Sequence, residues 1–199
     1  MKDYTETKER ITEYITANLK EKRLKHVFGV RDTALNLCRL YGGDMEKAEL
    51  CALFHDMYKY LSVDQVNYYV NLYNLDEKYL NNPNLAHSKL AAVAMRRDYG
   101  IEDEDMLNAV AYHTTGRACM SVLEKIIALS DFIEPNRSFP EVYRTRELAE
   151  EDLDRACLYM YEKTIEFLNY RIANGEDITI DNDTIEAKEY LWKTLNMQK

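Results

Sequence analysis

Apolar residues along most of the chain recur every three or four positions, which is the spacing of one face of an α-helix. In the first such segment, Ile11, Ile15 and Leu19 fall on one stripe. The segment AELCALFHD is apolar almost all round, so we expect it to form a central, buried helix. The pattern predicts helices over about residues 5–19, 22–41, 45–56, 62–73, 83–99, 103–113, 121–134, 140–149, 151–173 and 183–196.

Glycine and proline are scarce, which sharpens this prediction. The 199 residues include only 6 Gly and 3 Pro, too few for the many tight turns of a sheet-rich protein. We therefore predict an all-α fold in one domain spanning residues 1–199. Residues from about 138 to 199 would form a C-terminal helical part, either an extension of the core or a surface for a partner.

Charge and hydropathy exclude several classes of protein. The formal net charge of −9 argues against binding to a nucleic acid polymer, because such proteins carry basic surfaces. The charged start of the chain lacks the apolar region of a secretory signal, and no apolar run approaches the roughly 20 residues of a membrane helix. The four cysteines form no CxxC pair and lie among apolar neighbours. We expect reduced, buried thiols in a cytoplasmic protein.

The four histidines carry the clearest chemical signal. Each lies on or at the end of a different predicted helix, and the second is followed directly by an aspartate in LFHDMYK. Another aspartate lies in the apolar segment IIALSDFIEP, where a buried carboxylate is costly unless a cation or donors meet it. Imidazole and carboxylate groups suit divalent ions such as zinc, iron and manganese. The residues thus predict a metal site made of His26, His55, Asp56, His87, His113 and Asp131. The alternative is a helical interaction module with buried histidines.

Five segments resemble one family within the HD-domain superfamily of metal-dependent phosphohydrolases, the YqeK family. They are RLKHVFGV (23–30), ALFHDMYK (52–59), LAHSKLAA (85–92), YHTTGR (112–117) and LEKIIALSDFIEPNR (123–137). Members of that family are symmetrical bis(5'-nucleosyl)-tetraphosphatases, which cut diadenosine tetraphosphate into two ADP. The resemblance implies an HD-domain helical bundle whose metal-binding core spans about residues 20–137.

The resemblance also implies a division of the ligands between two metals. His26, His55, Asp56 and Asp131 would bind one ion, and Asp56 would bridge to a second ion held by His87 and His113. It suggests iron, and hence a di-iron centre, whereas the ligand types alone admit zinc or manganese equally.

Basic and hydroxyl side chains near these motifs fit a polyphosphate substrate. Lys59 and Arg117 are the expected catalytic cations, which would stabilise negative charge beside the bridging Asp56. Arg23 and Arg137 are expected either to bind phosphate or to brace a metal ligand. Backbone and hydroxyl donors near Arg117 could add contacts, although capping a helix end explains the threonines equally well; these residues are Thr114, Thr115 and Gly116. Tyr58, Tyr60, Tyr68 and Tyr69 could stack on adenine, but packing accounts for most tyrosines.

The expected function is metal-dependent, symmetrical hydrolysis of diadenosine tetraphosphate, with a dinucleoside polyphosphate as the only partner and a homodimer as a plausible assembly. Two alternatives keep the metal site. One is a nucleotidase that acts on mononucleotides, and the other is a metal-bound nucleotide sensor with little turnover.

Overall fold

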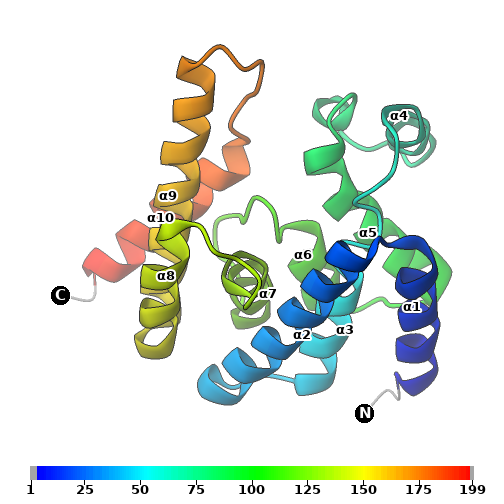
Figure 1. Cartoon of the computed structure of the whole chain (residues 1–199), viewed down its shortest axis with the longest axis horizontal. Coiled ribbons are helices and arrows are strands. Elements are labelled where there is room, and N and C mark those ends of the chain that lie inside the picture. The colour runs from blue at the N-terminus through cyan, green and yellow to red at the C-terminus, as the bar shows by residue number, and fades with distance from the viewer. Residues whose placement is uncertain (1–3, 198–199) are drawn as a thin grey trace.

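The computed structural model of the chain describes residues 4–197, and within them it contains helices and turns but no strand (Figure 1). The prediction of an all-α fold is confirmed. The single domain predicted over 1–199 stays a prediction, and its residues 1–3 and 198–199 lie outside the described part. The helices are α1 (Thr5–Asn18), α2 (Glu21–Tyr41), α3 (Met45–Phe54), α4 (Val63–Leu72), the 3₁₀ helix η1 (Glu77–Tyr79), α5 (Pro83–Tyr99), α6 (Glu104–Ala111), α7 (Val122–Ile133), α8 (Pro140–Glu151), α9 (Leu153–Ala173) and α10 (Asn182–Met197).

Local capping chemistry fixes the helix ends, and for this reason the predicted α-helix boundaries agree with the structure to within two residues. Ser62 and Ser121 each begin a helix with a capping box, completed by Gln65 and Glu124. In this arrangement the serine side chain accepts from a backbone N–H, and the later side chain returns the bond to the cap. Gly100 ends α5 in the left-handed conformation, with φ at 66°, which glycine adopts without a steric penalty.

Two functional segments lie just beyond the helices in which they were predicted. α3 ends at Phe54, so His55 and Asp56 do not occupy consecutive positions of that helix. The chain continues through turns closed by hydrogen bonds from residue i to residue i−3, donated by the N–H groups of Met57, Lys59 and Leu61. This is the tighter winding of a 3₁₀ helix. His113 similarly follows the end of α6 at Ala111, in a turn that runs to Thr115.

Two apolar helices, α3 and α7, form the centre of the core. α3 buries six of its ten residues, as its all-round apolar sequence predicts, and α7 buries eight of its twelve. α2, α6 and α9 pack around α7, while α1 and α5 pack against α3. A smaller cluster joins α4, η1 and α5 through Val66, Val70 and Leu90. Because apolar burial is the main stabilising contribution to folding, these two helices provide a rigid support for the residues at their ends.

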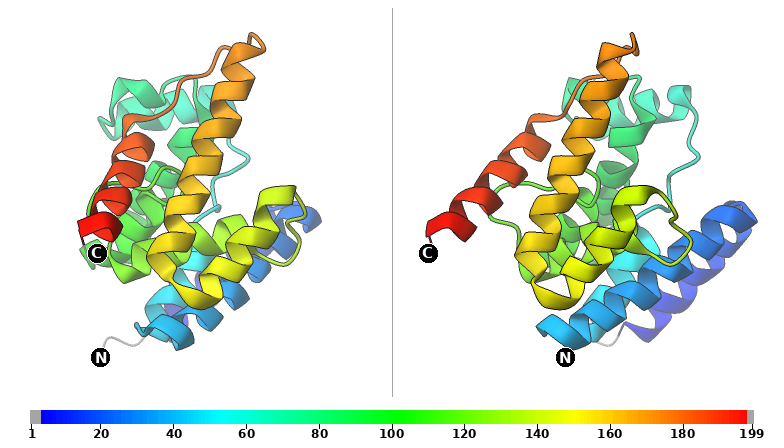
Figure 2. Two further views of the ribbon diagram at one scale, coloured as in Figure 1. Left: turned by 90° about the vertical axis from the view of Figure 1, so that its left-hand side faces the viewer. Right: turned by 60° about the vertical axis from the view of Figure 1, so that its left-hand side comes forward.

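The C-terminal helices α8, α9 and α10 lie together on one side of the molecule, across α7 from α1 and the α4–α5 region (Figures 1 and 2). The first half of α9 is packed into the core, with Leu153, Ala156, Cys157, Met160 and Tyr161 buried. Its second half projects beyond the core. No helix among residues 4–197 is long and apolar enough to cross a membrane.

The cysteines differ from the prediction at one position. Cys38, Cys51 and Cys157 are buried free thiols, whereas Cys119 is exposed. Cys119 lies in the turn between His113 and α7, where its φ is 58°. Its side chain is exposed to solvent and does not enter the core.

Candidate metal centre

Four buried imidazoles converge at the middle of the molecule. His26 comes from α2, His55 follows α3, His87 comes from α5 and His113 follows α6, and none is more than 6% exposed. The Nε2 atoms of His26 and His55 are 3.4 Å apart, and those of His87 and His113 are 3.2 Å apart. Residues from four separate parts of the sequence therefore form one cluster.

Hydrogen bonds on the outer side of the cluster determine which nitrogen of each ring faces inward. Each Nδ1 lies within hydrogen-bonding distance of an oxygen that can only accept. For three rings this is a backbone carbonyl: that of Ala52 for His55 (2.6 Å), of Val110 for His113 (2.8 Å) and of Pro83 for His87 (3.2 Å). For His26 it is a carboxylate oxygen of Glu134, at 3.1 Å. Each Nδ1 therefore carries the proton and donates it. In the neutral ring, Nε2 is then left as a lone-pair donor towards the centre of the cluster, the arrangement typical of metal-binding histidines.

Asp56 lies between the two histidine pairs with one oxygen towards each. Its Oδ2 is 3.6 Å from Nε2 of His26 and 3.5 Å from Nε2 of His55. Its Oδ1 is 3.1 Å from Nε2 of His87 and 4.0 Å from Nε2 of His113. The carboxylate is only 2% exposed. This is the geometry that a bridging ligand between two ions requires.

Asp131 joins the cluster on the His26 side only. One of its carboxylate oxygens lies 3.1 Å from Nε2 of His26, and Arg137 donates to the same carboxylate at 2.8 Å. The prediction of a buried carboxylate holds only in part, because 23% of the Asp131 side chain is exposed. Asp131 therefore connects the buried cluster with the protein surface.

The protonation states suit metal binding. Burial opposes the charge on Asp56, but His55 and His87 outweigh it and hold the pKa of this carboxyl well below its usual value. Burial likewise opposes the charge on Asp131, yet His26, His55 and the guanidinium of Arg137 together keep its pKa well below normal. Burial lowers the pKa of His113 to about 3, and it also lowers the pKa of His87.

The pKa of His55 shifts in the opposite direction from those of His87 and His113. Burial acts to lower its pKa, but the adjacent Asp56 outweighs this, so the pKa of His55 is raised. The carboxylate of Asp56 thus favours positive charge beside it.

The donor set fits divalent metal ions. Two groups of ligand atoms lie within 4.8 Å of one another, namely His26, His55 and Asp56, and Asp56, His87 and His113. Converging lone pairs and ionised carboxylates in a buried space repel one another, and a cation between them removes that repulsion. All six predicted ligands are brought together, and imidazole with carboxylate is a donor set for zinc, iron or manganese.

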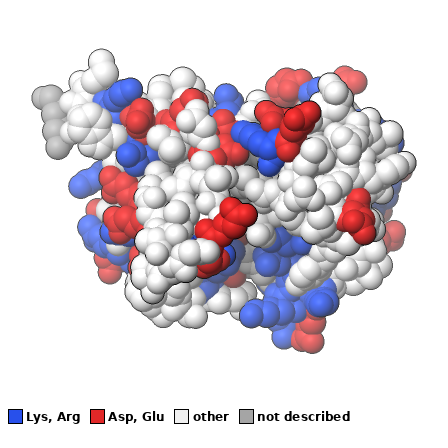
Figure 3. Space-filling model, turned by 90° about the horizontal axis from the view of Figure 1, so that it is seen from above, with Lys and Arg blue, Asp and Glu red and all other residues white. Residues whose placement is uncertain are grey.

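Two of the predicted basic residues reach the cluster directly. Arg23 donates to Oδ2 of Asp56 at 2.6 Å, and Nζ of Lys59 lies 3.5 Å from Nε2 of His87. Arg137 reaches it through Asp131. Seen from above, the surface is hollowed between the two sides of the molecule, and lysine and arginine atoms are exposed in that hollow (Figure 3).

The turn after His113 contains further residues that were predicted to contact the substrate. Arg117 forms two hydrogen bonds of 2.7 Å with the carboxylate of Glu124, which is buried at the start of α7. Such a bidentate pair is strong, so it holds the guanidinium against the start of α7.

Its neighbours Thr115 and Gly116 also have close contacts within the protein. The buried Thr115 hydroxyl donates to the carbonyl of Gly116. A Cβ placed on Gly116 would lie 2.4 Å from the hydroxyl of Tyr161 on α9. Arg117 and Gly116 thus link the turn to α7 and α9, and the substrate contact expected of Arg117, Thr115 and Gly116 stays a prediction.

One further residue at the cluster, Glu134, was not predicted. The buried Glu134 carboxylate accepts a hydrogen bond from Nδ1 of His26. It also accepts hydrogen bonds of 2.8 Å from the backbone and side-chain N–H groups of Asn136. The sequence did contain a signal for it, since Glu134 follows Asp131 by three positions in the same apolar segment. Thr114 places its hydroxyl 3.2 Å from Nε2 of His113, so this threonine, and not Thr115, lies at the centre.

Comparison with known proteins places the chain in a family. Residues 23–136 match the model of the HD domain. The chain is 39% identical over 155 residues to the symmetrical bis(5'-nucleosyl)-tetraphosphatase of Bacillus subtilis (strain 168), and 43% identical over 156 residues to the protein of the same name from Halalkalibacterium halodurans. Each match covers 77% of this chain and 83% of the relative.

A solved structure agrees with this match. The crystal structure of a predicted HD superfamily hydrolase involved in NAD metabolism, from Clostridium acetobutylicum, superimposes with a TM-score of 0.82 at 38% identity. The superposition covers 98% of this chain and 99% of that one. The family expected from the sequence motifs is thereby confirmed, and the chain belongs to the HD-domain hydrolases, together with the proteins named symmetrical bis(5'-nucleosyl)-tetraphosphatase.

Proposed function

We propose that the protein hydrolyses diadenosine tetraphosphate symmetrically, giving two molecules of ADP, at a centre of two divalent metal ions. The observation that carries the proposal is the convergence of four inward-facing Nε2 atoms on the two oxygens of Asp56. The names of the relatives supply the substrate.

His26, His55, Asp56 and Asp131 would hold one ion, and Asp56, His87 and His113 the other. Ions bound there supply Lewis acidity towards phosphate oxygens and acidify water. We further propose iron for both positions, with zinc or manganese as the alternatives that the donor set admits.

The protein's own residues would perform three tasks. Asp56 fixes the two halves of the centre relative to one another through its two oxygens. Lys59, beside His87, stabilises negative charge that develops on the attacked phosphoryl group. Arg23 and Arg137 have N–H donors beyond those directed at Asp56 and Asp131, and they bind the flanking phosphates. The leaving group is a nucleoside diphosphate, which departs without a general acid.

Product analysis tests the proposal. The metal-stripped protein, reloaded with ferrous iron, manganese or zinc, should release ADP as the only nucleotide product from diadenosine tetraphosphate. In ¹⁸O-water, one of every two ADP molecules should carry the label on its terminal phosphate. ATP together with AMP would contradict the symmetrical cut.

The same experiment distinguishes the alternatives. Phosphate released from a panel of mononucleotides, with no ADP from the dinucleotide, would favour a nucleotidase. Binding of the dinucleotide without product after hours would favour a sensor, and a protein that takes up no metal on reconstitution would favour an interaction module. The cytoplasmic location and the homodimer stay predictions, and light scattering of the purified protein tests the second.

A further inference from the structure

A pocket adjoins the metal centre on the side of the C-terminal helices. It encloses about 650 Å³ between the end of α7, the loop that leads into α8, and the second half of α9. Pockets that bind small molecules have volumes of roughly 300–1,000 Å³. The pocket is therefore large enough for a nucleoside.

Two residues are shared between this pocket and the candidate metal centre. Asp131 lines the pocket and also lies 3.1 Å from Nε2 of His26. Arg137 lines the pocket too, and its guanidinium donates to Asp131. A ligand whose phosphates lie at the metal centre would thus pass Arg137 and continue into the pocket.

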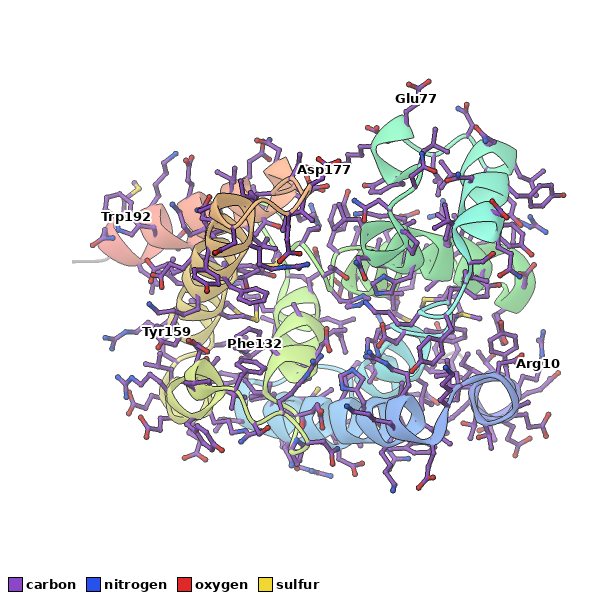
Figure 4. The ribbon with its side chains drawn as sticks, turned by 45° about the horizontal axis from the view of Figure 1, so that its top comes forward. Arg10, Glu77, Phe132, Tyr159, Asp177 and Trp192 are labelled. Atoms are coloured by element: carbon purple, nitrogen blue, oxygen red, sulfur yellow. The ribbon has the colours of Figure 1, made fainter. Side chains whose placement is uncertain are left out.

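Aromatic rings form the walls of the pocket. Phe132 and Phe139 pack edge to face, with ring centroids 4.9 Å apart, and Figure 4 shows Phe132 between α7 and the ribbons of α8 and α9. Phe167 and Tyr170 line the pocket from α9 and are 59% and 68% exposed. Neighbouring exposed apolar rings on one helix face are a feature of surfaces that bind a ligand or partner.

We propose that this pocket, which we call the α9 pocket, binds one nucleoside of the substrate, with the base stacked on Phe167 and Tyr170. The inference rests on the proposed function, since it takes the phosphates to lie at the metal centre. Stacking on aromatic rings suits a purine, because every base has a π-face. The ion pair of Lys163 and Glu166, 2.6 Å apart, provides polar groups at the rim.

The α9 pocket would give the chain its preference for nucleotides over simple phosphates. Residues 23–136, which match the HD domain, contribute the metal ligands. Phe139, Phe167 and Tyr170 lie beyond that match. The tyrosines considered from the sequence alone are placed elsewhere: Tyr58, for example, packs against Tyr14 and Tyr69.

The alternative occupant is a second copy of the chain, with Phe167 and Tyr170 in a dimer interface. The continuity with Arg137 and Asp131 favours a ligand. The shape of the pocket also favours a ligand. In a dimer interface, two flat helix faces would bury the exposed rings against each other and leave no pocket between them.

Binding of ADP and of inorganic pyrophosphate, measured by calorimetry on the metal-loaded protein, tests the inference. Phe167→Ala and Tyr170→Ala should each weaken ADP binding by about tenfold, the usual effect of removing one stacking ring, and leave pyrophosphate binding unchanged. For diadenosine tetraphosphate, KM should rise and kcat should hold. Phe167→Tyr should restore ADP binding. Trp192→Ala is the matched control, since Trp192 is 54% exposed on α10 away from α7 (Figure 4).

Four results would overturn the inference. The first three are unchanged ADP affinity in both alanine variants, equal weakening of ADP and pyrophosphate binding, and a change of oligomeric mass that accompanies the loss of affinity. The fourth is the absence of ADP binding in the unsubstituted protein. Failure of the proposed function shows separately, in the products of the unsubstituted protein, because the binding measurement does not depend on turnover.

Discussion

The histidine cluster has two halves, His26 with His55 and His87 with His113, and they differ in the groups that surround them. On the His26 side, two carboxylates reach the imidazole, those of Asp131 and Glu134, and both are linked to further polar groups. On the other side, His87 and His113 are held by backbone carbonyls, and no second carboxylate accompanies Asp56 among the residues that the structure describes.

We expect this difference to give the two halves separate tasks. Each added carboxylate increases the electrostatic attraction for a divalent ion, so the His26 side, where Asp131 and Glu134 accompany Asp56, should hold its ion more tightly. The His87 side depends on neutral imidazoles and has the ammonium of Lys59 nearby. It should therefore exchange its ion more readily and be the side at which charge develops on the substrate.

The comparison depends first on Asp56, which belongs to both halves. Asp56→Ala should remove both ions and abolish turnover, because each half loses the carboxylate that the two halves share. Metal content per chain and ADP release measure this. Asp177→Ala, an exposed position in the loop after α9 (Figure 4), is the matched control. An Asp56→Ala protein that keeps its metal would contradict the bridging role.

His26→Ala and His113→Ala, compared as a pair, test the inequality of the two halves. After dialysis against a chelator, His113→Ala should keep the ion near Asp131, whereas His26→Ala should lose both ions. The reason is that only the His26 side has a second carboxylate in contact with its imidazole. Elemental analysis measures the metal content of each variant. Equal losses in the two variants would show that the two halves hold their ions equally tightly.

Lys59 and Arg117 were both predicted to bind phosphate, but their surroundings differ. Lys59→Met should lower kcat by about a hundredfold, as loss of one charge-stabilising donor does, with metal content unchanged. Arg117→Met should leave kcat within a few-fold and lower the free energy of unfolding by roughly 2–3 kcal/mol, because Glu124 is left buried without its partner. Kinetics and urea unfolding distinguish the two variants. A large loss of kcat in Arg117→Met, with unchanged stability, would show that Arg117 acts on the substrate.

The smallest expected effect concerns Glu134. Glu134→Gln keeps an oxygen that can accept from His26 but removes the negative charge, so metal affinity should fall by roughly tenfold, as for other residues that orient a ligand. The loss should concern only the more tightly held ion. Glu147→Gln, at an exposed position of α8, is the control. A loss of both ions would show that Glu134 supports the whole cluster.

Local and long-range features of the chain differ in how well the sequence predicts them. The capping residues Ser62 and Ser121 act on their own helices, so the helix ends could be predicted closely. The cluster of candidate metal ligands could be predicted because it uses all four histidines of the chain and two aspartates that lie in apolar segments. The direction of Arg117 could not, since it depends on Glu124 at the start of another helix. The α9 pocket depends on how α9 packs against α7, and no local pattern contains that information.

The exposed thiol at Cys119 has a practical consequence. Burial protects Cys38, Cys51 and Cys157 from reagents in water and raises the pKa of each of these thiols. A maleimide fluorophore added to the native protein should therefore attach at this one position, between the His113 turn and α7. Such a label would report movement of that turn during turnover without the introduction of a new cysteine.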